Sequence, residues 1–238
     1  MHRTLTLFFF FLMFINGYTQ EKKIDLSSLD QAYREDQFFL GATLNFVTQT
    51  HSAFSQNALS GGFQLGFVRD IPLNKQRNIG IGLGLGYNLN IYNTNLFVGQ
   101  YQNGESVMLA LDQLALDQLD LEVKRNRFTT QALEVPIQFR WRTSTSEYQK
   151  FYRIYAGFNF AYTFNFKANY RDTVQELSTT NPSFLNQFRT GAHLVLGHGA
   201  INFYVQYYFD SLLEGEIQNS SEVVNFEVLK FGLIFYIL

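Results

Sequence analysis

Histidines and carboxylates are the residues with which this chain could perform acid–base or metal chemistry. The sequence holds four histidines and no cysteine, so thiol catalysis and thiolate metal sites are excluded. No histidine has a second histidine at metal-ligand spacing. His193 and Asp210 with a serine could form a hydrolytic set, but no nucleophile motif accompanies them. The sequence therefore predicts a protein that is not an enzyme, with no catalytic residue, no metal and no cofactor.

The stretch GIGLGLG, Gly80–Gly86, is a second candidate for chemistry, because glycine-rich loops can bind nucleotide phosphates. It lacks the third glycine of the G-x-G-x-x-G pattern, and no helix start follows it. In the wider stretch NIGIGLGLGYNLNIY, large apolar residues alternate with the glycines. This spacing predicts a β-strand with large side chains on one face and almost none on the other. A net charge of −2 also gives no electrostatic case for nucleic acid, and we expect no small-molecule substrate.

Alternation of apolar and polar residues recurs along the chain, which is the pattern of β-strands with two different faces. Eight segments show it, at residues 38–46, 62–67, 78–92, 133–142, 152–166, 188–197, 201–210 and 229–237. Their apolar faces carry no charged residue, whereas charged residues occur on the opposite faces. The strands that these segments form must position any functional side chain.

Two architectures produce such alternation: a soluble sandwich with a dry core, and an outer-membrane barrel whose apolar face contacts lipid. The even number of segments, their length and their uncharged apolar faces favour the barrel. The connections also alternate between long and short, as in small barrels with long extracellular loops and short periplasmic turns. We therefore predict an all-β fold, an eight-stranded antiparallel transmembrane β-barrel surrounded by the outer-membrane lipid bilayer.

The N-terminal residues predict export. A short basic start precedes the apolar run Leu5–Ile15, and small residues follow just before Gln20. This is the pattern of a cleaved signal peptide, and the run is too short for a membrane-spanning helix. We expect a signal peptide at residues 1–19, a periplasmic segment at 20–36 and the barrel at 37–238, in the outer membrane.

The interior of an eight-stranded barrel is just wide enough for side chains to fill it. We interpret the glycine face of the strand around Gly80–Gly86 as room for arginines and tyrosines of other strands. Charges in such a narrow interior need partners. The expected lumen network consists of Glu134, Arg189, His193, Asp210 and Lys230. Pro136, which cannot donate a backbone hydrogen bond, predicts a local bulge.

The predicted periplasmic end is basic. Its cations either meet lipid phosphates and water or form a docking rim for an acidic partner. The candidate rim residues are Arg69, Asp70, Arg77, Arg140, Arg142 and Arg153. At the other end, the longest loop carries the imperfect duplication ALDQLALDQLDLEVK, Ala110–Lys124. Its leucines either fold over the barrel mouth or are covered by a partner.

Three stretches resemble the PorT family of outer-membrane proteins: REDQFF (34–39), GGFQLGFVRDIPLNKQRNIGIGLGLGYNLN (61–90) and FRWRTSTSEYQKFYRIYAGF (139–158). The turns RDIPLNKQRN and FRWRTSTSE are the most specific parts, because alternation is common to all small barrels. The resemblance implies an accessory or assembly component of type IX secretion, with other secretion-system proteins as partners and no catalytic residues. That system exports proteins with a C-terminal sorting domain and in some bacteria supports gliding motility. The alternative is a general structural or adhesive barrel with surface-binding loops.

Overall fold

The computed structural model describes residues 36–48, 54–56, 58–101, 103–111, 122–143, 152–199, 201–218 and 223–237. All of them belong to one compact unit, Arg34–Leu238. The predicted signal peptide, the periplasmic segment before residue 36 and most of the loop duplication lie outside the described residues. Within the described part, no helix is long and apolar enough to cross a membrane.

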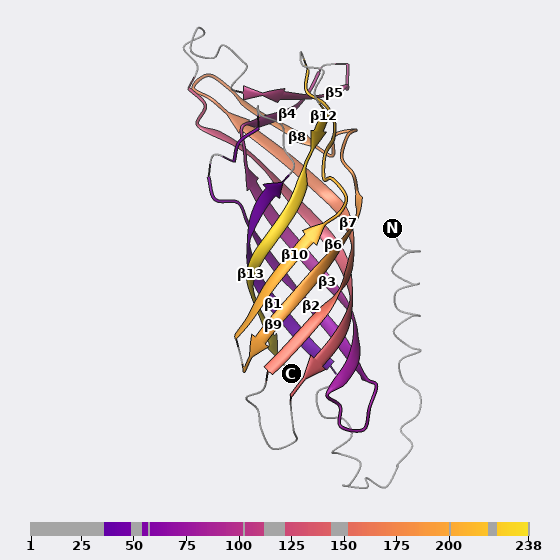
Figure 1. The fold of residues 1–238 in the computed structure, drawn as a ribbon. Coiled ribbons are helices and arrows are strands. Elements are labelled where there is room, and N and C mark those ends of the chain that lie inside the picture. Colours follow the sequence, from indigo (N-terminus) through magenta and orange to yellow (C-terminus); the bar gives the residue numbers. More distant parts are fainter. Residues whose placement is uncertain are drawn as a thin grey trace, which may run out of the picture. The chain divides into compact units, whose positions relative to one another are not determined.

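Eight long strands form a closed antiparallel barrel (Figure 1). The strands follow the predicted segments and extend several of them. They are β1 (Asp36–Thr48), β2 (Gly61–Pro72), β3 (Ile79–Asn93), β6 (Arg125–Arg142), β7 (Tyr152–Arg171), β9 (Phe188–His198), β10 (Ile201–Tyr208) and β13 (Glu227–Ile237). Each pairs with its neighbour in this order, and β13 pairs with β1, from Phe38 opposite Ile237 to Thr48 opposite Glu227. The predicted eight-stranded barrel is confirmed, and its closure gives the backbone groups of every barrel strand a partner within the membrane.

Five short strands lie at the end of the barrel that carries the long loops (Figure 1). Strands β4 (Leu96–Gln100) and β5 (Ser106–Ala110) form a hairpin, and β11 (Glu214–Glu216) pairs with β12 (Val223–Asn225). Strand β8 (Glu176–Thr180) pairs with the last residues of β7. Among the residues that the structure describes, the opposite end carries only short turns, so we assign it to the periplasm.

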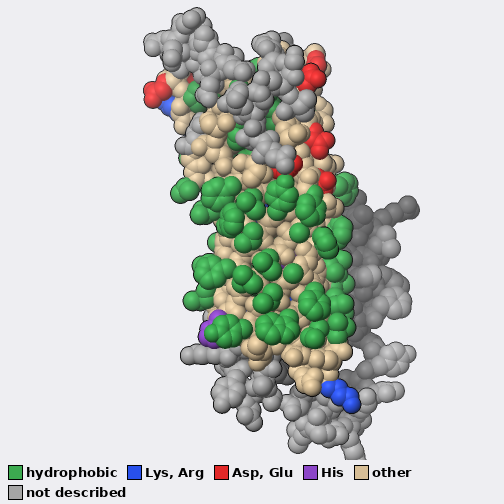
Figure 2. Space-filling model, in the orientation of Figure 1, with side chains coloured by type: hydrophobic (Ala, Val, Ile, Leu, Met, Phe, Trp, Pro, Cys, Tyr) green, Lys and Arg blue, Asp and Glu red, His purple; other side chains and the backbone are tan. Residues whose placement is uncertain are grey.

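The outward face of the barrel wall is apolar. On β3, for example, Ile81, Leu83 and Leu85 are 39%, 48% and 56% exposed. Figure 2 shows such side chains as a belt across the visible face of the wall, with acidic side chains gathered beyond one end of it. A belt of this kind contacts lipid tails, as the alternation predicted.

The glycines of β3 face inward, where other strands use the space they leave. A Cβ atom on Gly82 would lie 2.6 Å from Nε of Arg140. One on Gly86 would lie 2.8 Å from Cζ of Phe39. An arginine of another strand therefore uses this space, as expected, and a phenylalanine of β1 uses it as well.

Pro136 causes no bulge, which corrects the expectation from sequence. It lies opposite Asn159 in regular register, and the register shift between β6 and β7 falls at Gln131/Ala132. On the other side of β6, the pairing with β3 is interrupted around Pro136 but resumes in the same register. The missing N–H of Pro136 thus interrupts the hydrogen bonding to β3 locally, but no extra residue is inserted into the strand as a bulge would require.

Candidate functional site

The carboxylate of Glu134 is buried in the lumen and accepts hydrogen bonds from three side chains on two strands. Asn88 on β3 donates its side-chain amide to Oε2. Gln206 on β10 donates Nε2 to Oε1 at 2.5 Å, and the Tyr208 hydroxyl lies 3.3 Å from the same oxygen. Neither Asn88 nor Gln206 was predicted as a member of the network. Their neutral amides lie on the polar faces of the strands, and beyond this inward position the sequence held no feature that marked them as partners of Glu134.

Two buried cations lie against the ring of Tyr208. Cζ of Arg189 is 4.1 Å from the ring centroid, and Nζ of Lys230 is 5.1 Å from it. Both side chains are about 1% exposed. Among the described residues the Arg189 nitrogens have no hydrogen-bond partner, so the aromatic face is their main polar contact. Tyr208 thereby joins both cations to Glu134.

His193 and Asp210 stand apart from this cluster. His193 is buried and stacks on Tyr204, with ring centroids 6.0 Å apart, and its nitrogens have no hydrogen-bond partner in the described part of the chain. Asp210 accepts hydrogen bonds from the backbone N–H of Thr190 at 2.5 Å and from its hydroxyl at 2.7 Å. Its predicted place in the lumen network is wrong, because β10 ends at Tyr208 and the alternation ends with it.

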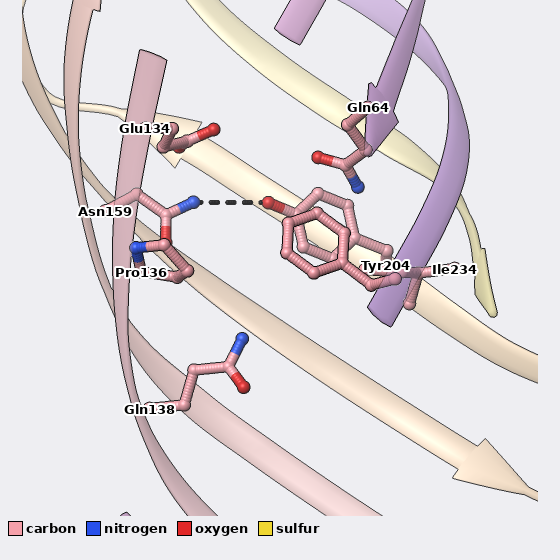
Figure 3. Close-up of a pocket in the computed structure, with 8 residues that line it drawn as sticks. Gln64, Glu134, Pro136, Gln138, Asn159, Tyr204 and Ile234 are labelled. Carbon is pink, nitrogen blue, oxygen red and sulfur yellow. Dashed lines mark hydrogen bonds between the residues drawn. The ribbon is translucent and has the colours of Figure 1, made fainter. Parts of the chain in front are cut away.

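A small cavity lies in the middle of the lumen, with a volume of about 20 Å³ (Figure 3). Its wall includes Gln64, Glu134 and Asn159, and Asn159 donates its amide to the Tyr204 hydroxyl at 3.2 Å. This volume accommodates roughly one water molecule. The described side chains thus leave no continuous channel here, as expected for an eight-stranded barrel.

An apolar cluster seals the lumen at the extracellular end. Phe128 stacks on Tyr92, with centroids 5.0 Å apart, and Phe226 meets Phe128 edge-on at 5.1 Å. Leu212 and Leu213, from the loop after β10, are fully buried in the same cluster. The sequence interpretation missed this plug. The one indication in the sequence was that Tyr92 lies on the same, inward-facing side of β3 as the glycines.

Asp172 organises the extracellular turn between β7 and β8. Its Oδ1 accepts the backbone N–H groups of Val174 and Gln175, both at 2.7 Å. These hydrogen bonds, from Gln175 first and then Val174, lower the pKa of the Asp172 carboxyl, because they favour its charged form. In the neighbouring loop, Ala110 and Leu111 are buried. The next ten residues of the duplication, 112–121, lie outside the described residues, so both interpretations of it stay open.

The periplasmic end is built around Asp70. Its carboxylate forms an ion pair with Arg142, and Nη1 of Arg140 lies 3.8 Å from Oδ2. Nε of Arg142 also donates to the backbone carbonyl of Arg77 at 2.7 Å, which ties the end of β6 to the turn between β2 and β3. One buried carboxylate therefore faces two guanidinium groups.

Arg140 is enclosed on all sides. It donates to Oε1 of Gln138 at 2.9 Å and to Oε1 of Gln37 at 3.2 Å. Its Cζ lies 4.5 Å from the ring centroid of Tyr155 and 5.4 Å from that of Tyr236. Such contacts hold the guanidinium in the lumen and away from the periplasmic surface.

Most of the expected docking rim is inside the barrel, which corrects its placement. Arg140, Arg142 and Asp70 are buried, and so is Arg153, which donates to the carbonyl of Gly199 at 2.9 Å. The reason is the alternation of side chains along a strand, because every second residue of β6 still points inward at the end of the strand. Arg77 contributes its backbone carbonyl to the same end. Arg69 alone of the expected set has a largely exposed side chain, 61%, and it pairs with Asp36 at 3.6 Å.

Among the described residues, no three histidine, aspartate or glutamate side chains gather as metal ligands. Residues 19–213 match the family described as outer membrane protein beta-barrel domain. The chain belongs to this outer-membrane β-barrel family. Its membership, the closed barrel and the apolar belt place the protein in the outer membrane, in contact with the lipid bilayer.

Solved structures similar to this family member include Ail, the attachment invasion locus protein of Yersinia pestis. One is of Ail itself, at 13% identity and a TM-score of 0.33, and another is of its complex with the heparin analogue sucrose octasulfate, at 12% and 0.32. Each match covers 84% of this chain and 96% of Ail. No curated protein matches the chain.

We predict that Glu134→Gln lowers the free energy of unfolding by about 3 kcal/mol, because it removes the carboxylate charge from the cluster that contains Arg189 and Lys230. Urea titration in lipid vesicles, followed by the fluorescence of the single tryptophan, Trp141, measures this change. Tyr208→Phe is the matched control. It keeps the ring beneath both cations and removes one hydrogen bond, for an expected loss of about 1 kcal/mol. Equal losses in the two variants would show that the charge of Glu134 is not what stabilises the cluster.

Proposed function

We propose that this outer-membrane barrel is a non-enzymatic component of protein secretion that acts through contacts with other proteins. The observation that carries the proposal is where the two motif-bearing turns meet. RDIPLNKQRN supplies Asp70 and Arg77, and FRWRTSTSE supplies Arg142, which bonds to both of them. Residues that resemble the PorT family thus build one structure at the periplasmic end. The filled lumen supports contact, and not conduction, as the mode of action.

The periplasmic turn between β2 and β3 presents a defined surface. Its backbone is held by the bond from Leu73 N–H to the carbonyl of Ile79 at 2.9 Å and from Arg77 N–H to that of Asn74 at 3.0 Å. Leu73 and Lys75 are exposed on it, and Arg69 lies at its base. We name Arg69, Leu73 and Lys75 the periplasmic face. Two cations beside an apolar side chain suit an acidic partner protein.

The resemblance to the PorT family supports type IX secretion as the setting of these contacts. In that setting, the protein assists assembly or function of the translocon, and its partners are other proteins of the secretion system. Gliding motility is an additional expectation for bacteria in which this system supports it.

A structural or adhesive barrel is the second candidate, and an extracellular groove favours it. The groove has a volume of about 370 Å³ and lies between the β4–β5 hairpin and the loop that contains β11. Tyr101, Phe184 and two glutamates, Glu105 and Glu216, are among its walls. An adhesive role predicts normal export and a defect in surface binding when the protein is removed.

We expect the double variant Arg69→Glu/Lys75→Glu to reduce export of proteins with C-terminal sorting domains by about fivefold or more, since it reverses the charge of the periplasmic face. Secreted proteins are quantified in a strain that carries only the variant. Glu105→Lys, an exposed charge change at the other end, is the matched control and should leave export unchanged. Normal export by the double variant, with normal barrel assembly, would contradict a docking role for this face.

A further inference from the structure

Four cations lie on the outward face of the barrel wall, beyond the apolar belt at its extracellular end. They occupy neighbouring strands, with Arg125 and Arg127 on β6 and Lys167 and Arg171 on β7. Arg125 pairs with Arg171 in the β6–β7 register, and Lys167 lies opposite Thr129. We name these four cations the basic band. Among the described residues the acidic partner of the band is Glu176, which lies 3.6 Å from Arg171. The band therefore carries an excess of positive charge.

An apolar groove runs beside the basic band. Its volume is about 330 Å³, and it crosses the outer surface of β2 and β3. Leu59, Phe63, Leu89 and Ile91 form its apolar walls, and Gly61 leaves its floor open because it has no side chain. A hydrocarbon chain fits such walls, which lie in the outer part of the lipid-facing surface.

Arg127 is part of the wall of this groove. It lies opposite Asn93 on β3 and Asn169 on β7, so neither neighbouring strand offers it a carboxylate in register. Its Nε atom is buried and has no hydrogen-bond partner among the described residues. A guanidinium group in the wall of an apolar groove, with no carboxylate opposite it, is suited to pair with an oxyanion.

We propose that this groove binds a phosphate-bearing lipid of the outer leaflet. One acyl chain lies between Phe63, Leu89 and Ile91, and the headgroup phosphate accepts hydrogen bonds from Arg127. The remaining cations of the basic band stabilise the negative charge of the headgroup. The site thereby anchors the wall of the barrel that runs from β2 to β7 to anionic lipid, independently of the periplasmic face.

The test uses the full-length folded protein in detergent micelles with bisphosphorylated lipid A as the probe, and dephosphorylated lipid A as the reference. Native mass spectrometry counts the lipid that is retained. Wild-type protein is expected to retain the phosphorylated lipid preferentially. Arg127→Gln should weaken its binding about tenfold, the scale of one lost charge-assisted hydrogen bond. Lys75→Gln, an exposed cation at the periplasmic end, is the matched control.

Gly61→Leu tests the groove without touching a charge. The nearest heavy atom to a Cβ at Gly61 is the carbonyl oxygen of Thr43, at 3.3 Å, so a small shift accommodates the new side chain, which then fills the groove. This variant should reduce retention of the lipid as strongly as Arg127→Gln does. Heat-modifiable electrophoretic mobility establishes that each variant is folded.

Three results would overturn the proposal. The first is equal retention of phosphorylated lipid A by wild type and Arg127→Gln. The second is equal retention of the phosphorylated and dephosphorylated lipids by wild type. The third is full displacement of the lipid by inorganic phosphate together with normal retention by Gly61→Leu, which would show a simple anion site.

Discussion

Replacing Arg142 with glutamate is expected to abolish the folded form of the barrel. Asp70 is 2% exposed, and Arg142 is its ion-pair partner. The substitution would place a second carboxylate beside Asp70 in a site that water barely reaches, with Arg140 as the remaining cation. Removal of one partner from a buried ion pair costs about 3–5 kcal/mol, and a like charge in its place adds repulsion. A loss of this size is a large fraction of the roughly 5–15 kcal/mol by which folded domains are stabilised, so we expect assembly to fail.

Heat-modifiable mobility in an electrophoresis gel measures assembly, because folded and boiled barrels migrate differently. The matched control is Arg69→Glu, at the same end of the barrel but with an exposed side chain, for which we expect a change of about 1 kcal/mol or less. A second variant, Asp70→Arg/Arg142→Asp, exchanges the two charges and should restore part of the folded form. If Arg142→Glu assembled as well as Arg69→Glu, the buried ion pair would not be needed for the fold.

Gly84→Leu is expected to have the second large effect, a block of assembly through overpacking. A Cβ atom at this position would lie 2.7 Å from Cγ2 of Val68 and 3.0 Å from Cγ of Pro136. It would also lie 2.5 Å from the carbonyl oxygen of Phe67, which is held in the β2–β3 ladder. Extra atoms in a well-packed interior cost about 1–3 kcal/mol or more, and here both side chains and backbone would have to move.

Leu85→Phe is the control for this prediction, because it also enlarges a residue of β3, on the face that contacts lipid. The wild-type Leu85 side chain is exposed, so we expect assembly to be unchanged. The same gel assay compares the two variants with wild type. Normal assembly of Gly84→Leu would refute the view that the glycine face of β3 exists to make room for neighbouring side chains.

The barrel itself could be predicted from sequence, because its eight strands are long and each turns one face to lipid. The alternation of Phe38–Phe46 or Tyr152–Phe164 is imposed by that lipid contact at every second residue, whereas Phe166, expected on the same face, is buried in the apolar cluster inside the barrel. The short strands beyond the membrane escaped prediction. Strands β4 and β5 span five residues each and do not have one face in lipid, so their sequences carry no comparable pattern.

The sequence predicted which side chains face the interior, but it did not predict which of them contact one another. The alternation of side chains along the strands correctly placed Glu134, Arg189 and Lys230 in the lumen, yet it could not show that Tyr208 joins them. It also could not show where a strand stops, which is why Asp210 was misplaced. The expected rim was wrong for Arg140 and Arg142, because closeness to a strand end does not turn an inward side chain outward. The three-dimensional structure adds what the sequence could not show, which is that both guanidinium groups face the buried carboxylate of Asp70.

A clean deletion of the gene tests the central claim most directly. Proteins with C-terminal sorting domains are quantified in the medium, on the cell surface and in the periplasm, before and after re-expression of the wild-type chain. A role in secretion predicts that these proteins accumulate in the periplasm and that re-expression restores their export. Unchanged export in the deletion strain would contradict that role and would direct attention to the extracellular groove and adhesion.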